Sequence, residues 1–234
     1  MSLAVCTRLA KLVLASLPEL ASLEGLPSSI EEMEVSMALI QDLGPLAACA
    51  RLRELTLRGL AHLQNLGGLP ASLKVLKLAD CEDVTSLALL AACTGLQSLI
   101  CLALPGLTSL VGLPSDSLTA LTLADCPIHD LQPLAPCTRL THLQLVAMEQ
   151  LISLHGLPPS LVALVCARCL SLGSLALAPV LEACPILNNL MMQDLGQRRA
   201  GESGGPRAQY AAGRQAVEQL VAAWELASEA QHGA

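Results

Sequence analysis

At 234 residues, the chain is long enough for one ordinary domain or for one short solenoid with a tail. Hydrophobic residues make up 53% of it and charged residues 14%, which excludes a disordered chain; with one Trp, one Tyr and no Phe, its core must be built from Leu, Val, Ala and Cys. The net charge of −7, with no basic run longer than Arg198–Arg199, argues against nucleic acid or an anionic membrane and favours a protein partner.

A repeating pattern of leucines begins close to the N-terminus. Each copy reads L-x-x-L-x-L-x-x-(C/L), and the copies follow one another at a mean interval close to 22 residues. Alternate units follow the string Gly-Leu-Pro, and the others follow a cysteine three residues upstream. Nine copies in phase identify a repeat architecture, in which one turn can bury its leucines only against its neighbours. The units open at Leu9, Ile30, Leu52, Leu73, Leu96, Leu118, Leu140, Leu161 and Leu187.

This pattern resembles the leucine-rich-repeat family, and the resemblance covers residues 6–195. It implies a solenoid of the α/β class with a parallel sheet on its concave face. The residues agree, because the alternation in Leu121-Thr122-Leu123 has the period of two that a half-buried strand requires. Units this short leave little room for full helices, so we expect mostly turns, 3₁₀ segments and short helices on the convex face.

The ninth position of each unit departs from the family pattern. The family often has Asn there, whereas this chain has Cys81, Cys126 and Cys169 in three units and Leu, Met or Ala in the others. A ladder of Asn side chains bonded to the turn backbone is therefore largely missing. Because a thiol donates only weakly, we expect backbone groups or water to satisfy that turn.

The ten cysteines are mostly spaced at the repeat period, which argues against a disulfide framework. The first 17 residues do not resemble a signal peptide, because Arg8 and Lys11 interrupt the apolar stretch and the repeat already runs through it. We therefore expect reduced thiols and an intracellular location, either cytoplasmic or organellar.

Two short cysteine motifs are better explained by the repeat than by metal binding. Cys166 and Cys169 have the spacing of half a zinc site, yet both occupy core-facing positions and the sequence holds no second Cys-x-x-Cys. Cys126 and His129 offer a thiol and an imidazole without the further ligands that a site would need. We expect no metal and no cofactor.

Two other stretches also have ordinary explanations. The segment between Asp83 and Asp116 carries no charge, but its leucines keep the repeat phase, so we expect no membrane insertion. The acidic run at 31–34 places Glu32 and Glu34 on the open face of the sheet. That placement favours a solvated or partner-facing patch over a cation site, which needs ligands that converge from several directions.

A flexible linker at 196–207 and an amphipathic helix at 208–229 are predicted after the repeats. The linker contains Ser203 in a G-x-S-x-G string similar to the serine motif of trypsin-like proteases, but no fitting strand or histidine motif accompanies it, so we expect no catalytic residue. The apolar face of the helix includes Trp224 and could cap the solenoid or dock on a partner. The first unit has no obvious cap, so either a partner covers that end or the chain is a piece of a longer product.

The third, fifth and seventh residues of each unit are expected on the concave face, because side chains alternate along a strand. The first four units place charges of both signs there. The remaining units place small and apolar groups there, with His142 as the one ionisable side chain. Aliphatic residues at the same positions of neighbouring units would lie next to one another on this face, and such a group favours a partner-binding surface. The candidate binding residues are Glu32, Glu34, Glu54, Arg58, Lys77, Ile100, Leu102, His142, Val146, Val165 and Trp224.

These features predict a non-enzymatic protein–protein interaction scaffold, or a structural subunit of a larger intracellular assembly. It would bind protein partners through the concave face and the solenoid ends and would take no small-molecule substrate. The alternative is a substrate- or ligand-recognition subunit of a regulatory complex, as leucine-rich repeats provide in ubiquitin-ligase adaptors and immune receptors. Those roles normally need an additional domain, for which we expect no room in this chain.

Overall fold

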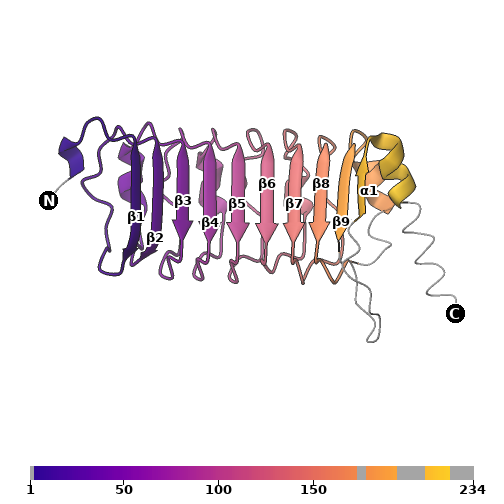
Figure 1. The fold of residues 1–234 in the computed structure, drawn as a ribbon, viewed down its shortest axis with the longest axis horizontal. Helices are drawn as coiled ribbons and strands as arrows, with labels where there is room; N and C mark the ends of the chain where they lie inside the picture. Colours follow the sequence, from indigo (N-terminus) through magenta and orange to yellow (C-terminus); the bar gives the residue numbers. More distant parts are fainter. Residues whose placement is uncertain (1–2, 173–177, 194–208, 222–234) are drawn as a thin grey trace.

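The structure, a computed structural model, describes residues 3–172, 178–193 and 209–221. Its main feature is a ten-stranded sheet whose strands lie side by side in chain order (Figure 1). The first nine strands run parallel, and the tenth runs antiparallel to the ninth. The strands are β1 (Lys11–Leu17), β2 (Glu32–Ala38), β3 (Glu54–Arg58), β4 (Val75–Ala79), β5 (Ser98–Leu102), β6 (Ala120–Ala124), β7 (His142–Val146), β8 (Ala163–Ala167), β9 (Asn189–Gln193) and β10 (Gln209–Ala212).

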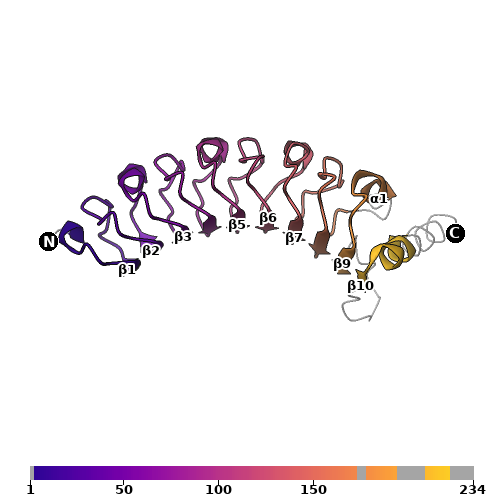
Figure 2. The same ribbon diagram turned by 90° about the horizontal axis from the view of Figure 1, so that it is seen from above.

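Each of the nine sequence units contributes one parallel strand, as predicted. The register advances by one unit per strand, so that Lys11 lies beside Glu32 and Glu32 lies beside Glu54. The sheet lines the inner side of an arc, and short helices and loops form its outer side (Figure 2). The predicted solenoid, with a parallel sheet on the concave face and little helix on the convex face, is confirmed.

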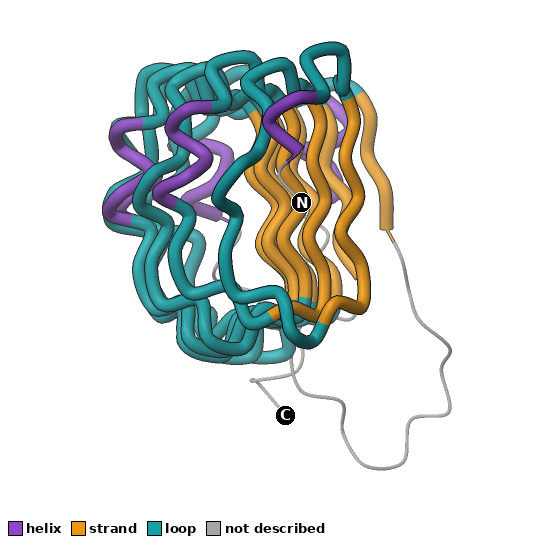
Figure 3. Tube along the Cα trace, turned by 90° about the vertical axis from the view of Figure 1, so that its left-hand side faces the viewer, coloured by secondary structure: helices purple, strands orange, loops and turns teal. Residues whose placement is uncertain are grey.

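The core lies between the sheet and the convex segments and is built of ladders of similar side chains. Leu52, Leu55, Leu57 and Leu60 occupy the first, fourth, sixth and ninth positions of the third unit, and each is at most 1% exposed. Figure 3 views this tube from its N-terminal end, with the strands on one side and the loops on the other. Complete burial of one leucine stabilises the fold by about 1.5–3 kcal/mol, and each interior turn buries several.

The convex side alternates between two kinds of turn, visible as larger and smaller loops in Figure 2. The larger kind contains a short helix, and 44 residues separate the first residues of η2, η3 and η4. The smaller kind carries the Gly-Leu-Pro string. The helices are η1 (Leu3–Val5), η2 (Gly44–Ala48), η3 (Ala88–Ala92), η4 (Gln132–Leu134) and α1 (Ala178–Ala183).

The glycine of the Gly-Leu-Pro string is required by the close approach of neighbouring turns. Gly112 has a φ of +100°, and a Cβ atom there would lie 2.2 Å from the Cα atom of Ala88, the first residue of η3. Gly68 approaches the backbone of Gly44 in the same way, and Gly156 approaches that of Gln132, the first residue of η4. Any side chain at these positions would push two stacked turns apart.

The eighth position of each of the first eight units adopts a left-handed backbone conformation, which the sequence pattern did not reveal. Its φ lies between 50° and 62°, although only Gly59 is a glycine. The N–H of this residue continues the ladder to the next strand, as where Ala147 donates to the Ala167 carbonyl at 2.8 Å. The conformation costs a non-glycine residue about 1–2 kcal/mol. The eight residues are Ser16, Met37, Gly59, Asp80, Ala103, Asp125, Ala147 and Arg168.

The ninth-position cysteines donate hydrogen bonds, so the expectation that only backbone or water would satisfy this turn is wrong for three units. Cys81 Sγ lies 3.3 Å from the Ala79 carbonyl oxygen and 3.9 Å from that of Leu57 in the preceding unit. Cys126 and Cys169 contact the equivalent pairs of carbonyl oxygens. Each thiol therefore bridges its own turn to the one before it.

The solenoid continues at its C-terminal end into β10, where a helix was predicted. The prediction of a helix at 208–229 is wrong for Gln209–Ala212, which pairs antiparallel with β9. The physical reason is the open edge of β9, whose outward N–H and C=O groups offer this segment hydrogen bonds that outweigh its local helical pattern.

A helix at 214–221 follows β10 and covers the end of the core. Val217 and Val221 are at most 1% exposed and belong to the core cluster. Arg214 donates to the carbonyl oxygens of Cys184 and Leu181 at 2.8 and 3.1 Å. Through these contacts the helix at 214–221 caps the C-terminal end of the solenoid, which is one of the two roles predicted for it.

Gly112→Ala is expected to lower the free energy of unfolding by about 3 kcal/mol or more, because the new Cβ adds a backbone clash to an unfavourable φ. The measurement is urea denaturation followed by circular dichroism. Gly59→Ala is the matched control, since it shares the positive φ but its Cβ would meet nothing closer than 3.5 Å. Equal losses in the two variants would contradict the close-approach explanation.

Ala147→Gly is expected to raise the free energy of unfolding by about 0.5–1 kcal/mol, because relief at φ 51° exceeds the added entropy of the unfolded chain. The same urea titration measures the change. Ala124→Gly, in strand β6, should instead be destabilising, because that residue has no positive φ to relieve. A loss of stability in Ala147→Gly would show that the left-handed turn is unstrained.

Candidate protein-binding surface

The concave face is formed by the third, fifth and seventh residues of each unit. The register places these three positions in columns that cross the nine parallel strands. Of the side chains in these columns, Ser36 and Ala167 are buried, at 6% and 8% exposure, and all the others are exposed or half-buried. The face can therefore be contacted along nearly its whole length.

Two ion pairs bridge neighbouring units at the N-terminal part of the solenoid, and the second of them ends on Asp80 in the turn after β4. Lys11 Nζ lies 2.8 Å from Glu32 Oε2, and Arg58 Nε lies 3.2 Å from Asp80 Oδ2. The hydrogen bond that Lys11 donates to the Glu32 carboxylate, followed by the charge of Glu32, raises the pKa of Lys11. All four side chains are largely exposed, so the pairs orient the charges more than they stabilise the fold.

Glu34 and Glu54 lie close to the first of these pairs. Glu54 is the cross-strand neighbour of Glu32, and the charges of Glu54 and Glu34 also raise the pKa of Lys11. Lys77 follows on β4, beside Thr56 in the central column. The structure thus brings together the five charged candidates on β2 to β4 as a patch of mixed sign.

The apolar candidates form two groups rather than one continuous patch. Ile100 and Leu102 both lie on β5. Val146 and Val165 lie on β7 and β8, diagonally across adjacent columns. Strand β6 separates the groups with Thr122 and two alanines, which leaves roughly 10 Å between β5 and β7 at the usual strand spacing.

Met191 extends the second apolar group and was not among the candidate residues. It is the cross-strand neighbour of Val165 and is half-buried. Its fifth-position placement is visible in the sequence, because Met191 follows Leu187 by four residues, as Val165 follows Leu161. Val146, Val165 and Met191 therefore form one apolar patch across β7 to β9.

His142 lies on the concave face at the edge of these apolar groups. Its side chain is exposed, and its Nδ1 lies 2.9 Å from Thr141 Oγ1. Its cross-strand neighbours are Ala120 and Ala163, whose small side chains leave the imidazole accessible from the concave side.

The cysteine motifs pack in the core, as predicted. Cys166 and Cys169 are both fully buried, and Cys126 is 2% exposed while His129 lies at the surface. In the described ranges, no group of three or more His, Cys, Asp or Glu residues is arranged to hold a metal ion. No helix in those ranges is long and apolar enough to cross a membrane.

A surface hollow of about 210 Å³ lies away from the concave columns, beside the turns that follow β5, β6 and β7. Asp125, Cys126 and Glu149 are among its lining residues. Burial raises the pKa of the Cys126 thiol and so disfavours its reactive thiolate form. This hollow does not provide an activated nucleophile.

Three predictions fall outside the part of the chain that the structure describes. These are the linker at 196–207, the G-x-S-x-G string around Ser203, and Trp224 in the distal part of the predicted helix. They remain predictions.

The solenoid is similar to a solved bacterial structure. An internalin, InlF of Listeria monocytogenes, superposes with a TM-score of 0.53 at 22% sequence identity, over 80% of this chain and 61% of the internalin chain. The chain has a leucine-rich-repeat fold. This likeness extends to the fold alone, and the chain spans about three fifths of the internalin's length.

A second and weaker likeness is to the functional domain of InlJ from the same organism, which includes a cysteine ladder. The TM-score is 0.37 at 13% identity, over 81% of this chain and 59% of that one. A likeness this distant supports no inference about the leucine-rich-repeat chain. No protein-family model matches the sequence, and no curated protein matches it either.

The cysteines of this leucine-rich-repeat fold are free thiols, and burial separates nine of them from solvent. Desolvation raises the pKa of the nine buried thiols, and in Cys184, where Arg214 partly opposes it, the pKa rises to about 11. Cys6 alone is exposed. Because the thiolate is the reactive form, the buried thiols should be inert in the folded chain.

A maleimide at neutral pH is therefore expected to modify one thiol per folded chain, and all ten after denaturation. Mass spectrometry of the labelled protein counts the modified sites. Cys6→Ser should reduce labelling of the folded chain to background. Rapid labelling of several thiols in the folded chain would contradict the buried cysteine ladders.

Proposed function

We propose that this chain is a non-enzymatic protein-interaction scaffold or structural subunit of a larger assembly, and that it binds partners through the concave face and the solenoid ends. The observation that carries the proposal is the composition of the exposed concave columns. They combine a charged patch of mixed sign on β2 to β4 with exposed or half-buried apolar side chains on β5 and β7 to β9.

The aliphatic groups support binding because they would be desolvated by a partner that follows the curvature of the sheet. Leu102 is 38% exposed on β5, and Val146 in the seventh-position column and Val165 in the central column are half-buried. Alanines flank these residues, so a helix or an extended loop could approach the sheet backbone closely. Removing apolar surface of this kind from water favours protein association.

The charged patch supports a role in orientation. The exposed pairs Lys11–Glu32 and Arg58–Asp80, with Glu34, place charges of both signs on β1 to β3 and on the turn after β4. Charges at the rim of an interface mainly steer association and set the register of the partner. A partner with complementary charges at one end and an apolar face at the other fits this arrangement.

The free thiols support an intracellular location, since ten reduced cysteines are typical of a reducing compartment. The concave columns contain no buried charged group among the described residues.

The test is affinity capture from native lysate with the double variant Ile100→Asp/Val165→Asp beside the unmodified chain. We expect at least a tenfold loss of one defined set of co-purifying proteins, since a desolvated charge in an interface costs about 2–5 kcal/mol. Circular dichroism must show that the variant is folded.

The matched control is Leu89→Asp/Ile152→Asp, which changes two exposed aliphatic residues outside the sheet. It should leave the captured set intact. If the concave variant retains the same partners, the concave face is not the binding surface. Weak exchange among several clients, instead of one stoichiometric complex, would point to the recognition-subunit alternative.

A further inference from the structure

The two ends of the solenoid differ in how they are covered. The C-terminal end is closed by β10 and the helix at 214–221. At the N-terminal end, the core-facing residues are exposed or half-buried, whereas the equivalent residues 43 positions later are at most 1% exposed. These end residues are Leu3, Cys6, Leu9, Leu12, Leu14 and Leu17.

Strand β1 is the edge of the sheet at this end, with β2 as its neighbour on one side. The Ala10 carbonyl accepts the Glu32 N–H at 3.0 Å, which fixes the alternation of the β1 backbone. The N–H and C=O groups of Val13, like those of the residues two before and two after it, therefore point away from β2. Among the described residues, no strand pairs with this outer edge of the seven-residue β1, and such an edge is a template for pairing with another strand.

We propose that a second copy of this chain covers the N-terminal end, by antiparallel pairing of β1 with the β1 of the second copy about a two-fold axis at Val13. The two sheets would join into one, concave face beside concave face. The interface is isologous, so it closes as a dimer and does not propagate. The proposal concerns the solenoid end, and it is independent of binding at the concave columns.

The opposite end shows that an antiparallel strand fits this sheet. There β10 pairs antiparallel with β9 and contributes Ala211, which is 4% exposed, to the core. A second copy of β1 would occupy the corresponding place at the N-terminal end. Its Leu12 and Leu14 would face the core there, in the way that Ala211 of β10 faces the core at the C-terminal end.

The register follows from the alternation of faces. Directly opposed residues of antiparallel strands point to the same face, so a core residue must lie opposite a core residue. With Val13 on the axis, Leu12 lies opposite the second copy's Leu14, and both of these half-buried side chains point into the core. Shifting the register by one residue would place leucines opposite concave-face residues.

Charge complementarity favours a second copy over an unrelated strand. Arg8 lies just before β1 and Glu19 just after it, and both are exposed. Antiparallel pairing about Val13 brings Arg8 of each copy next to the turn that carries the second copy's Glu19. The end therefore carries opposite charges at the two positions that a two-fold axis would join.

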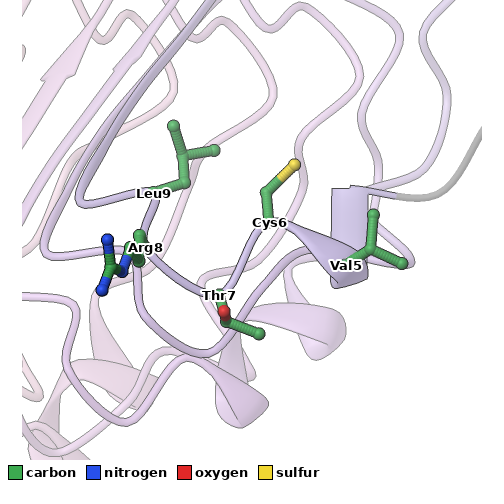
Figure 4. Close-up of a pocket in the computed structure, with 5 residues that line it drawn as sticks. All are labelled: Val5, Cys6, Thr7, Arg8 and Leu9. Atoms are coloured by element: carbon green, nitrogen blue, oxygen red, sulfur yellow. The ribbon is translucent and has the colours of Figure 1, made fainter.

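The shape of the end agrees with this pairing. A hollow of about 420 Å³ is lined by residues 5–9, which include Val5, Cys6 and Leu9 (Figure 4). The same register places residues 17–21 of the second copy opposite this segment. Leu17, which is 40% exposed, and the half-buried Leu20 are the apolar side chains available there to fill the hollow.

The first experiment is sedimentation equilibrium of the full chain from about 1 to about 100 µM, where a biologically useful dimer must be detectable. We expect reversible dimerisation. Val13→Pro removes the outward N–H at the axis without removing a bond to β2, and should weaken the dimer at least about tenfold. A full chain that stays monomeric over the whole range overturns the proposal.

Charge exchange tests the contact between Arg8 and Glu19. Arg8→Glu and Glu19→Arg should each weaken self-association, because each homodimer would then oppose like charges. Mixing the two variants should restore association, since both contacts of the mixed dimer become attractive. Unchanged dimerisation in both single variants would exclude this geometry.

A disulfide locates the axis directly. In a Cys6→Ser background, Val13→Cys places two thiols on opposed residues whose Cα atoms are about 5.5 Å apart, within the range of a disulfide. Mild oxidation should yield a covalent dimer. Thr122→Cys, in the same column at the middle of the sheet, is the matched control and should remain monomeric. Equal cross-linking of the two variants would overturn the proposed register.

Discussion

The whole structure depends on the fact that no single turn can bury its own leucines. A turn of about 22 residues has one strand and one short convex segment, and its apolar side chains are covered only when the next turn stacks on it. The parallel hydrogen-bond ladder sets the spacing of this stack, and the leucines at the first, fourth and sixth positions fill it. Every other feature either keeps neighbouring turns at this distance or deals with the place where the stacking ends.

Several unusual features of the chain follow from that spacing. Because Gly112 has no side chain, its turn can lie directly against the backbone of the neighbouring turn. The left-handed eighth residue ends the strand and turns the chain toward the convex side, while its N–H still donates to the neighbouring strand. Cys81 and its equivalents replace larger polar groups at the tight turn, because a thiol is small enough to be buried and can still contact two carbonyl oxygens.

The N-terminal end and the concave face carry the side chains that a partner could contact. At the C-terminal end, β10 and Val217 complete the last layer, whereas the layer at Leu12 and Leu14 is left half-covered. On the concave face, side chains at the third, fifth and seventh positions cannot contribute to stacking, so they are free to vary from Glu34 on β2 to Val165 on β8. The fold thus separates residues that hold the solenoid together from residues available to partners.

The sequence by itself determined the number of units, the strand positions and the face on which each strand residue lies, because period-two alternation and a 22-residue repeat are local signals. It placed Met33 in the core and Glu32 and Glu34 on the open face, as the structure has them. Only the tertiary structure decided how apolar residues of different strands group, with Ile100 apart from Val165, since that depends on cross-strand register. It also decided that Gln209–Ala212 forms a strand, because the free edge of β9 supplies hydrogen bonds that a local pattern cannot reveal.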